Sequence, residues 1–92
     1  MGIAAVKIKV MPSSPDTDLE EIKEEIKILS ETAGAKNLSI TEEPIAFGLT
    51  ALILFFAWDE SQEIESFEEK LRSLDNVNSV EVIDMRRAFG WK

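Results

Sequence analysis

The chain has 92 residues, of which 45% are hydrophobic, so it has the size of one small domain with a single core. Eighteen Asp and Glu against ten Lys and Arg give a net charge of −8, which opposes general attraction to nucleic-acid backbones and anionic lipid surfaces. The sequence has no Cys and no His, which excludes thiol nucleophiles, disulfides, imidazole bases and the usual zinc ligands. We therefore expect one domain over residues 1–92 that binds neither nucleic acid nor membranes directly.

The first segment, residues 3–10, alternates between apolar and other residues, which predicts a strand with one buried face. The buried set would be Ala4, Val6, Ile8 and Val10. This alternation begins a few residues after Met1 and leaves no apolar signal segment, so we expect a cytoplasmic protein.

A helix is predicted next, because apolar residues recur three and four positions apart at Leu19, Ile22, Ile26 and Leu29. Asp16 or Thr17 suits its N-cap, and Gly34 suits a left-handed C-terminal stop. A short strand around Leu38 and Ile40 should follow this helix.

The longest apolar run of the chain spans residues 44–58 and is too short to cross a membrane, which takes about 20 apolar residues. Its part from Leu49 to Trp58 contains no charge and is rich in residues that favour strands. We predict a central strand with apolar side chains on both faces. Ile53 and Phe55 should point one way, and Leu52, Leu54 and Phe56 the other.

A second helix is predicted from the spacing of Ile64, Phe67, Leu71 and Leu74, with Ser61 as its cap. The last strand, residues 77–85, should place Val80 and Val82 on one face and Glu81, Ile83 and Met85 on the other.

This β-α-β-β-α-β order predicts an α+β, ferredoxin-like split β-α-β sandwich. Its four-stranded antiparallel sheet would have the order 4-1-3-2, with two helices on one face. The other face has no helix, so one apolar side of the central strand remains for a partner or for the C-terminal tail. The turn around Phe47 and the tail should lie at opposite ends of the sheet, about 30 Å apart.

Two stretches are candidate contact sites. In the turn, Phe47 between Ala46 and Gly48 is either a core residue at the start of a strand or an exposed anchor. The tail gathers basic and aromatic residues, which either cover the sheet edge or form a cationic probe with aromatic anchors. These tail residues are Arg86, Arg87, Phe89, Trp91 and Lys92.

No catalytic motif is present, and the acidic pairs Asp59-Glu60 and Glu42-Glu43 lack a third ligand nearby in sequence, so we interpret them as solvated turns. The residues favour a binding module over an enzyme. We predict no catalytic residue, no cofactor and no metal site.

Three stretches carry a resemblance to a known family: residues 44–58, residues 80–90 and the opening Val6-Lys7-Ile8-Lys9-Val10-Met11-Pro12. The chain resembles the archaeal translation elongation factor 1-beta family over its whole length. The resemblance implies guanine-nucleotide exchange on elongation factor 1-alpha, the GTPase that delivers aminoacyl-tRNA to the ribosome. It also implies that the chain works by binding, without covalent chemistry.

In eukaryotic relatives a Phe in the matching turn contacts the GTPase, which assigns that contact to Phe47. Their near-terminal Lys reaches toward the magnesium site, and its counterpart here is Lys92, with Arg86 or Arg87 as substitutes. The relatives carry Lys just after the turn, where this chain has Leu49-Thr50.

Two other classes of protein share this order of strands and helices and remain as alternatives. A single-stranded RNA binder of the RRM type would need stacking aromatics on the open sheet face and a basic surface. A small-ligand regulatory domain would dimerise through its sheet, whereas we expect the exchange factor to be a monomer when free.

Overall fold

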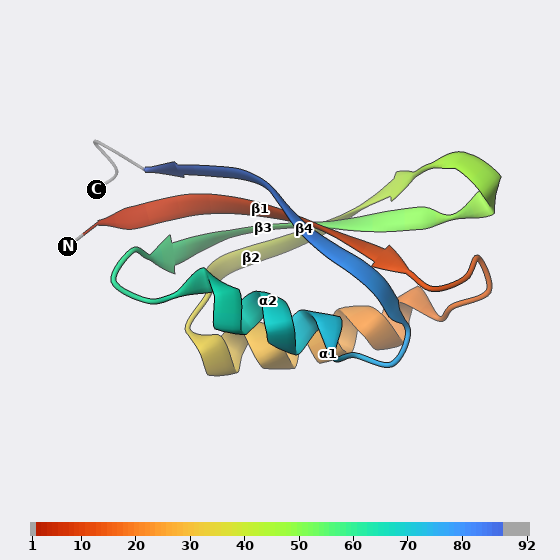
Figure 1. The fold of residues 1–92 in the computed structure, drawn as a ribbon, viewed down its shortest axis with the longest axis horizontal. Helices are drawn as coiled ribbons and strands as arrows, with labels where there is room; N and C mark the ends of the chain where they lie inside the picture. Colours follow the sequence, from red (N-terminus) through yellow and green to blue (C-terminus); the bar gives the residue numbers. More distant parts are fainter. Residues whose placement is uncertain (1, 88–92) are drawn as a thin grey trace.

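The structure, a computed structural model, describes the backbone of residues 2–87 and the side chains of residues 2–86. The predicted β-α-β-β-α-β order is confirmed (Figure 1). The elements are β1 (Ile3–Pro12), α1 (Leu19–Ala33), β2 (Lys36–Pro44), η1 (Ala46–Gly48, one 3-10 turn), β3 (Thr50–Asp59), α2 (Ile64–Arg72) and β4 (Val77–Arg87). Within the described range, no helix has the length and apolarity needed to cross a membrane.

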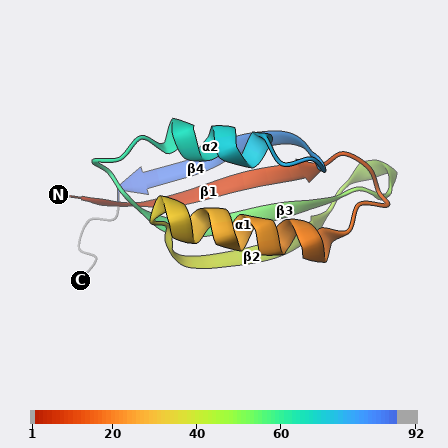
Figure 2. The ribbon, with the colours of Figure 1, turned by 90° about the horizontal axis from the view of Figure 1, so that it is seen from below.

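The strands form one antiparallel sheet in the order β2-β3-β1-β4, which is the predicted order read from the other edge. Both helices pack on one face of this sheet, as the two views in Figures 1 and 2 show. The predicted ferredoxin-like sandwich is therefore confirmed. The inner strands are β1 and β3, so the long apolar run does occupy the centre of the sheet.

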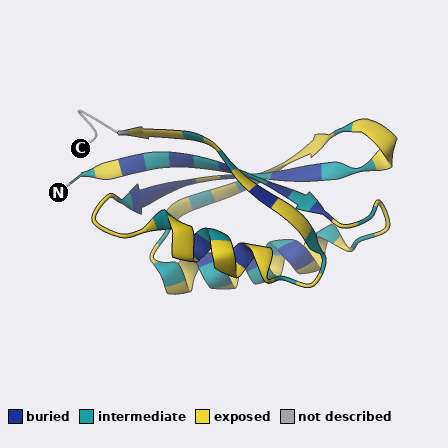
Figure 3. Ribbon diagram, in the orientation of Figure 1, coloured by how far each residue is buried: buried dark blue, intermediate teal, exposed yellow. Residues whose placement is uncertain are grey.

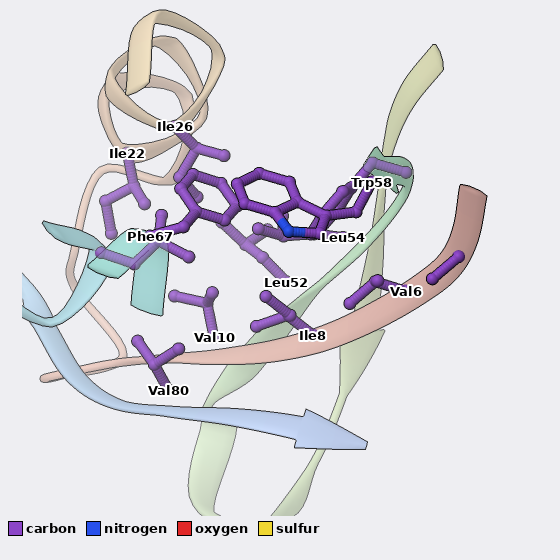
Figure 4. Close-up of a cluster of buried hydrophobic side chains, with 13 residues drawn as sticks. Val6, Ile8, Val10, Ile22, Ile26, Leu52, Leu54, Trp58, Phe67 and Val80 are labelled. Atoms are coloured by element: carbon purple, nitrogen blue, oxygen red, sulfur yellow. The ribbon is translucent and has the colours of Figure 1, made fainter. Parts of the chain in front are cut away.

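The core lies between the sheet and the two helices (Figures 3 and 4). Every second residue of β1 and of β3 points into it, because side chains alternate between the two faces of a strand. Ile22 and Ile26 of α1, with Phe67 and Leu71 of α2, close it from the helical side. The strand residues of this core are Ala4, Val6, Ile8, Val10, Leu52, Leu54, Phe56, Trp58 and Val80.

Three aromatic rings join the end of β3 to α2. The Trp58 ring stacks on Phe67 with 5.5 Å between centroids, and the Phe56 ring meets Phe67 edge to face at 5.4 Å. The indole Nε1 of Trp58 donates a hydrogen bond to the Gln62 carbonyl over 3.0 Å. This bond supplies the buried indole with the polar partner that it needs and fixes the entry into α2.

The predicted N-cap of each helix is wrong by one or two residues. The N-cap of α1 is Asp18, whose carboxylate accepts hydrogen bonds from the backbone N–H groups of Glu20 and Glu21. Thr17 is engaged elsewhere, because its hydroxyl accepts a bond from the Ser14 N–H. The N-cap of α2 is Glu63, whose side chain makes no capping bond. The predicted stop at Gly34 is confirmed, with φ at 92°.

The prediction for the end of β4 is wrong as well. The β1–β4 register shifts between Lys7, which is opposite Asp84, and Ile8, which is opposite Val82. The extra residue is Ile83, and a bulge of this kind reverses which face the following side chains occupy. Met85 consequently stands opposite Val6, on the helical face.

The face of the sheet without helices presents a mixed apolar and charged surface. In an antiparallel pair, residues opposite each other share a face, so Lys7 lies beside Phe55. The Lys7 Nζ is 6.0 Å from the centroid of the Phe55 ring, which is 47% exposed. We call this surface the open face; it includes Lys7, Lys9, Ile53, Phe55, Glu81 and Asp84, together with Ser39, Thr41 and Glu43 of β2 and Arg86 of β4.

Neighbouring residues of β3 should therefore respond very differently to truncation. Leu54→Ala removes a fully buried side chain and should lower the free energy of unfolding by about 2–5 kcal/mol. Phe55→Ala, on the open face, should cost less than about 1 kcal/mol. Urea denaturation followed by circular dichroism measures both values. A larger loss from Phe55→Ala than from Leu54→Ala would mean that the open face is covered in solution.

Candidate functional site

The turn between β2 and β3 holds the most exposed large apolar side chain among the described residues. Phe47 is 93% exposed, so the alternative of a core residue is ruled out and the side chain is open to solvent. The turn is closed by two backbone hydrogen bonds: Ile45 N–H donates to the Leu49 carbonyl over 2.8 Å, and Leu49 N–H donates to the Ala46 carbonyl over 3.3 Å. These bonds hold the phenyl ring at the tip of the molecule.

The backbone at Phe47 is strained. Its φ of 62° and ψ of 30° place it in the left-handed region, followed by Gly48 with φ at 74°. A residue with a Cβ atom costs about 1–2 kcal/mol in this region, where glycine costs nothing. An aromatic residue that is solvent-exposed and conformationally unfavourable contributes little to folding. Such a residue is typical of a binding site.

The loop after β1 lies beside this turn. A Cβ atom on Gly48 would come 3.8 Å from the Pro15 Cβ, so the two loops are in ordinary contact distance. Ala46, Phe47, Gly48 and Pro15 are all exposed. The structure therefore brings together the three turn residues that the sequence predicted and adds Pro15 next to them, which no spacing argument could have found.

The basic end of β4 lies at the other end of the sheet (Figure 1). Arg86 is exposed, and its Nε lies 3.2 Å from a carboxylate oxygen of Asp84. Arg87 is the last residue of β4 and stands opposite Ala4. The Phe47 turn and the start of the tail lie at opposite ends of the sheet, as predicted. β4 ends beside the start of β1, whereas the turn lies beyond the end of β1. Phe89, Trp91 and Lys92 lie outside the described residues.

The prediction of solvated turns holds for Asp59-Glu60, at the end of β3, but is wrong for Glu42 and Glu43, which lie within β2 and pair with Leu52 and Ala51 of β3. The Asp59 carboxylate accepts hydrogen bonds from the Ser61 N–H over 2.9 Å and from the Ser61 hydroxyl over 2.8 Å, and these bonds lower the pKa of Asp59. Glu42 accepts a hydrogen bond from Lys23 over 2.6 Å, which, together with the Glu20 carboxylate, raises the pKa of that lysine. In the part of the chain that the structure describes, no group of three Asp or Glu could hold a metal ion.

Comparison with known proteins adds the deciding observation. Residues 5–88 match the family described as "EF-1 guanine nucleotide exchange domain". The chain belongs to this family. It is 46% identical over 88 residues to a protein named elongation factor 1-beta from Methanosarcina barkeri, covering 95% of this chain and 99% of that protein.

A second elongation factor 1-beta, from Methanothermobacter thermautotrophicus, is 44% identical over 88 residues, covering 95% of this chain and 98% of that protein. These relatives confirm the resemblance to the archaeal family and the interpretation as a nucleotide-exchange factor of translation rather than an enzyme.

Solved structures support the fold alone. An ACT domain from the GTP pyrophosphokinase of Chlorobium tepidum superposes with a TM-score of 0.63 at 15% identity, covering 86% of this chain and 96% of that one. A putative antibiotic biosynthesis monooxygenase from Bacillus cereus gives a TM-score of 0.55 at 13% identity, covering 100% of this chain and 98% of that one. At such identities, the shared sandwich carries no functional conclusion.

The strained backbone makes a prediction that separates folding from function. Phe47→Gly relieves about 1 kcal/mol of left-handed strain but adds a similar amount of freedom to the unfolded chain, so stability should change by less than about 1 kcal/mol. Gly48→Ala, in the same turn, should cost about 1 kcal/mol, because its φ is also positive and no neighbour is close enough to clash. Thermal unfolding tests both. A loss above about 2 kcal/mol from Phe47→Gly would show that the ring supports the fold.

Proposed function

We propose that this exchange domain binds the elongation factor 1-alpha GTPase and accelerates the release of its GDP. The observation that carries the proposal is Phe47, which is almost fully exposed on a backbone that an aromatic residue adopts only at a cost. An exposed aromatic ring at a rigid tip is the kind of anchor that dominates binding energy when it enters an apolar pocket. Ala46 and Gly48 keep the flanks of the ring small.

The second contact in this proposal is the basic end of the chain, with Arg86, Arg87 and Lys92 as cations and with Phe89 and Trp91 as apolar anchors. A strand of ten residues separates this end from the Phe47 turn by about 30 Å. The factor would therefore touch two distant parts of one large partner. Since the sheet between them is continuous, a contact at one end fixes where the other end lies.

Exchange requires a difference in affinity. A factor that bound the GDP form and the nucleotide-free form of the GTPase equally well would not shift the equilibrium between them. The basic end supplies such a difference. Magnesium bridges the nucleotide phosphates and the switch loops and demands near-ideal octahedral coordination, so a cation placed beside it disfavours the ion and loosens GDP.

The alternative functions find less support. Of the aromatic residues with described side chains, only Phe55 lies on the open face, because Phe56, Trp58 and Phe67 are buried and Phe47 is at the turn. RNA binding of the RRM type uses stacking on two or three bases, so one aromatic residue on the open face gives it little support.

Repulsion between copies that each carry a charge of −8 supports a free monomer, and a translation partner implies action in the cytoplasm.

Phe47→Ala should lower the rate of GDP release from elongation factor 1-alpha by at least about tenfold at a fixed, subsaturating concentration of the factor. Release of a fluorescent GDP analogue measures it. Ile28→Ala is the matched control, because Ile28 is also a large exposed apolar residue but lies on α1, and it should retain the wild-type rate. Equal rates for the two variants would remove Phe47 from the site.

Deletion of residues 90–92 should also slow GDP release strongly, and it should do so through magnesium. With excess magnesium, the truncated factor should be at least about tenfold slower than the full chain. When the magnesium is chelated, the GDP release rates with the truncated factor and with the full chain should differ much less, because the ion that the tail is proposed to displace is already absent. Full activity of the truncated factor in magnesium would contradict the proposed role of the tail.

A further inference from the structure

The proposed function leaves open which side of the factor lies against its partner. The two proposed contact sites are at opposite ends of a molecule that measures 41 × 22 × 18 Å. A partner that reaches both ends must therefore pass along one long side of the sandwich. The candidates are the helical side, the two sheet edges and the open face (Figures 1 and 2).

Charge is distributed very unevenly between these sides. Residues 13–35 and 59–76, which contain both helices and the loops around them, hold fourteen Asp and Glu against four Lys and Arg. The strand residues outside these two ranges hold four Asp and Glu against five Lys and Arg. The helical side is therefore strongly acidic and well solvated, whereas the positive and negative charges of the strands nearly cancel.

The open face carries cations that are available to a partner. Neither Lys7 nor Lys9 forms an ion pair or a hydrogen bond with any described residue, although Asp84 and Glu81 stand opposite them on β4. On the helices, Lys23, Lys27 and Arg72 each have a carboxylate within 4.0 Å, and only Lys70 of the described helical cations has none. Unpaired lysines on an acidic protein are suited to meeting carboxylates of another molecule.

The same surface offers apolar side chains beside these two lysines. Phe55 is half exposed at the centre of the face, and Ile53, two residues earlier on β3, lies beside Lys9. A shallow hollow of about 110 Å³ opens next to the ring, lined by Asn37, Phe55, Phe56 and Ala57. An aromatic residue surrounded by polar groups and next to a hollow is a typical centre of a protein interface.

We propose that the open face is a third contact surface for the GTPase, and that the matching surface of the GTPase is an apolar patch bordered by carboxylates. This inference rests on the proposed function. In this arrangement the factor lies flat, with the sheet toward the partner, the helices toward solvent, and the Phe47 turn and the end of β4 at the two ends of the contact.

The test compares charge reversals on the two sides of the molecule. Lys7→Glu combined with Lys9→Glu should raise the factor concentration needed for half-maximal GDP release by at least about tenfold, with the largest effect at low salt. Lys27→Glu combined with Lys70→Glu changes the net charge equally but on exposed helical positions, and should change that concentration by less than about twofold. Equal effects of the two double variants would overturn the proposal.

Phe55→Ser gives an independent test that does not alter charge, and it should weaken the apparent affinity in the same way while circular dichroism and thermal unfolding show an intact fold. If this variant folds and exchanges like the wild type, the open face is not a contact surface. If the wild-type factor itself fails to release GDP, the proposed function fails instead. Binding of a fluorescent oligouridine that is lost in the lysine variant, with exchange unchanged, would assign the face to RNA and contradict the proposal.

Discussion

Along the centre of the sheet, β1 and β3 pair from Ile3 opposite Asp59 to Val10 opposite Leu52, and this pairing places every other element. Its register puts Val6, Ile8, Leu52 and Leu54 together on the face that the helices cover. A shift by one residue would exchange the two faces of a strand and expose this core. Since both edge strands pair with these two, the same register also determines that η1 lies at one end of the sheet and the end of β4 at the other.

This rigid frame explains how so small a protein can act on a much larger one. Factors of this kind make no bond and break none, so their only resource is binding energy that differs between states of the partner. Such energy is lost if the contacting groups must first be ordered. In the proposed complex little of this cost falls on Phe47, because a hydrogen-bonded turn already fixes its backbone in a left-handed conformation. In the proposed arrangement the acidic helices cover the core side of the sheet and face solvent.

Element types and their order could be predicted because they depend on repeating patterns: alternation in β1, helical spacing in α1 and α2, and an uncharged run in β3. Details that depend on competition between neighbours could not. Asp16, Thr17 and Asp18 are all suitable caps, and the choice depends on the turn that uses the Thr17 hydroxyl. The bulge at Ile83 leaves the alternation of the sequence unchanged, so the alternation alone predicts the wrong face for Met85. At the site, Gly48 indicated the turn, but the left-handed backbone of Phe47 and the nearby Pro15 follow only from tertiary structure.

In the proposed mechanism, one rigid molecule must present both ends to the same GTPase. This requirement is tested most directly by mixing two defective factors, Phe47→Ala and the chain without residues 90–92, and measuring GDP release from elongation factor 1-alpha. Each retains the end that the other lacks. If both ends must act from one frame, the mixture should release GDP no faster than the better of the two alone. Recovery of the wild-type rate by the mixture would show that the ends act independently and would contradict this account.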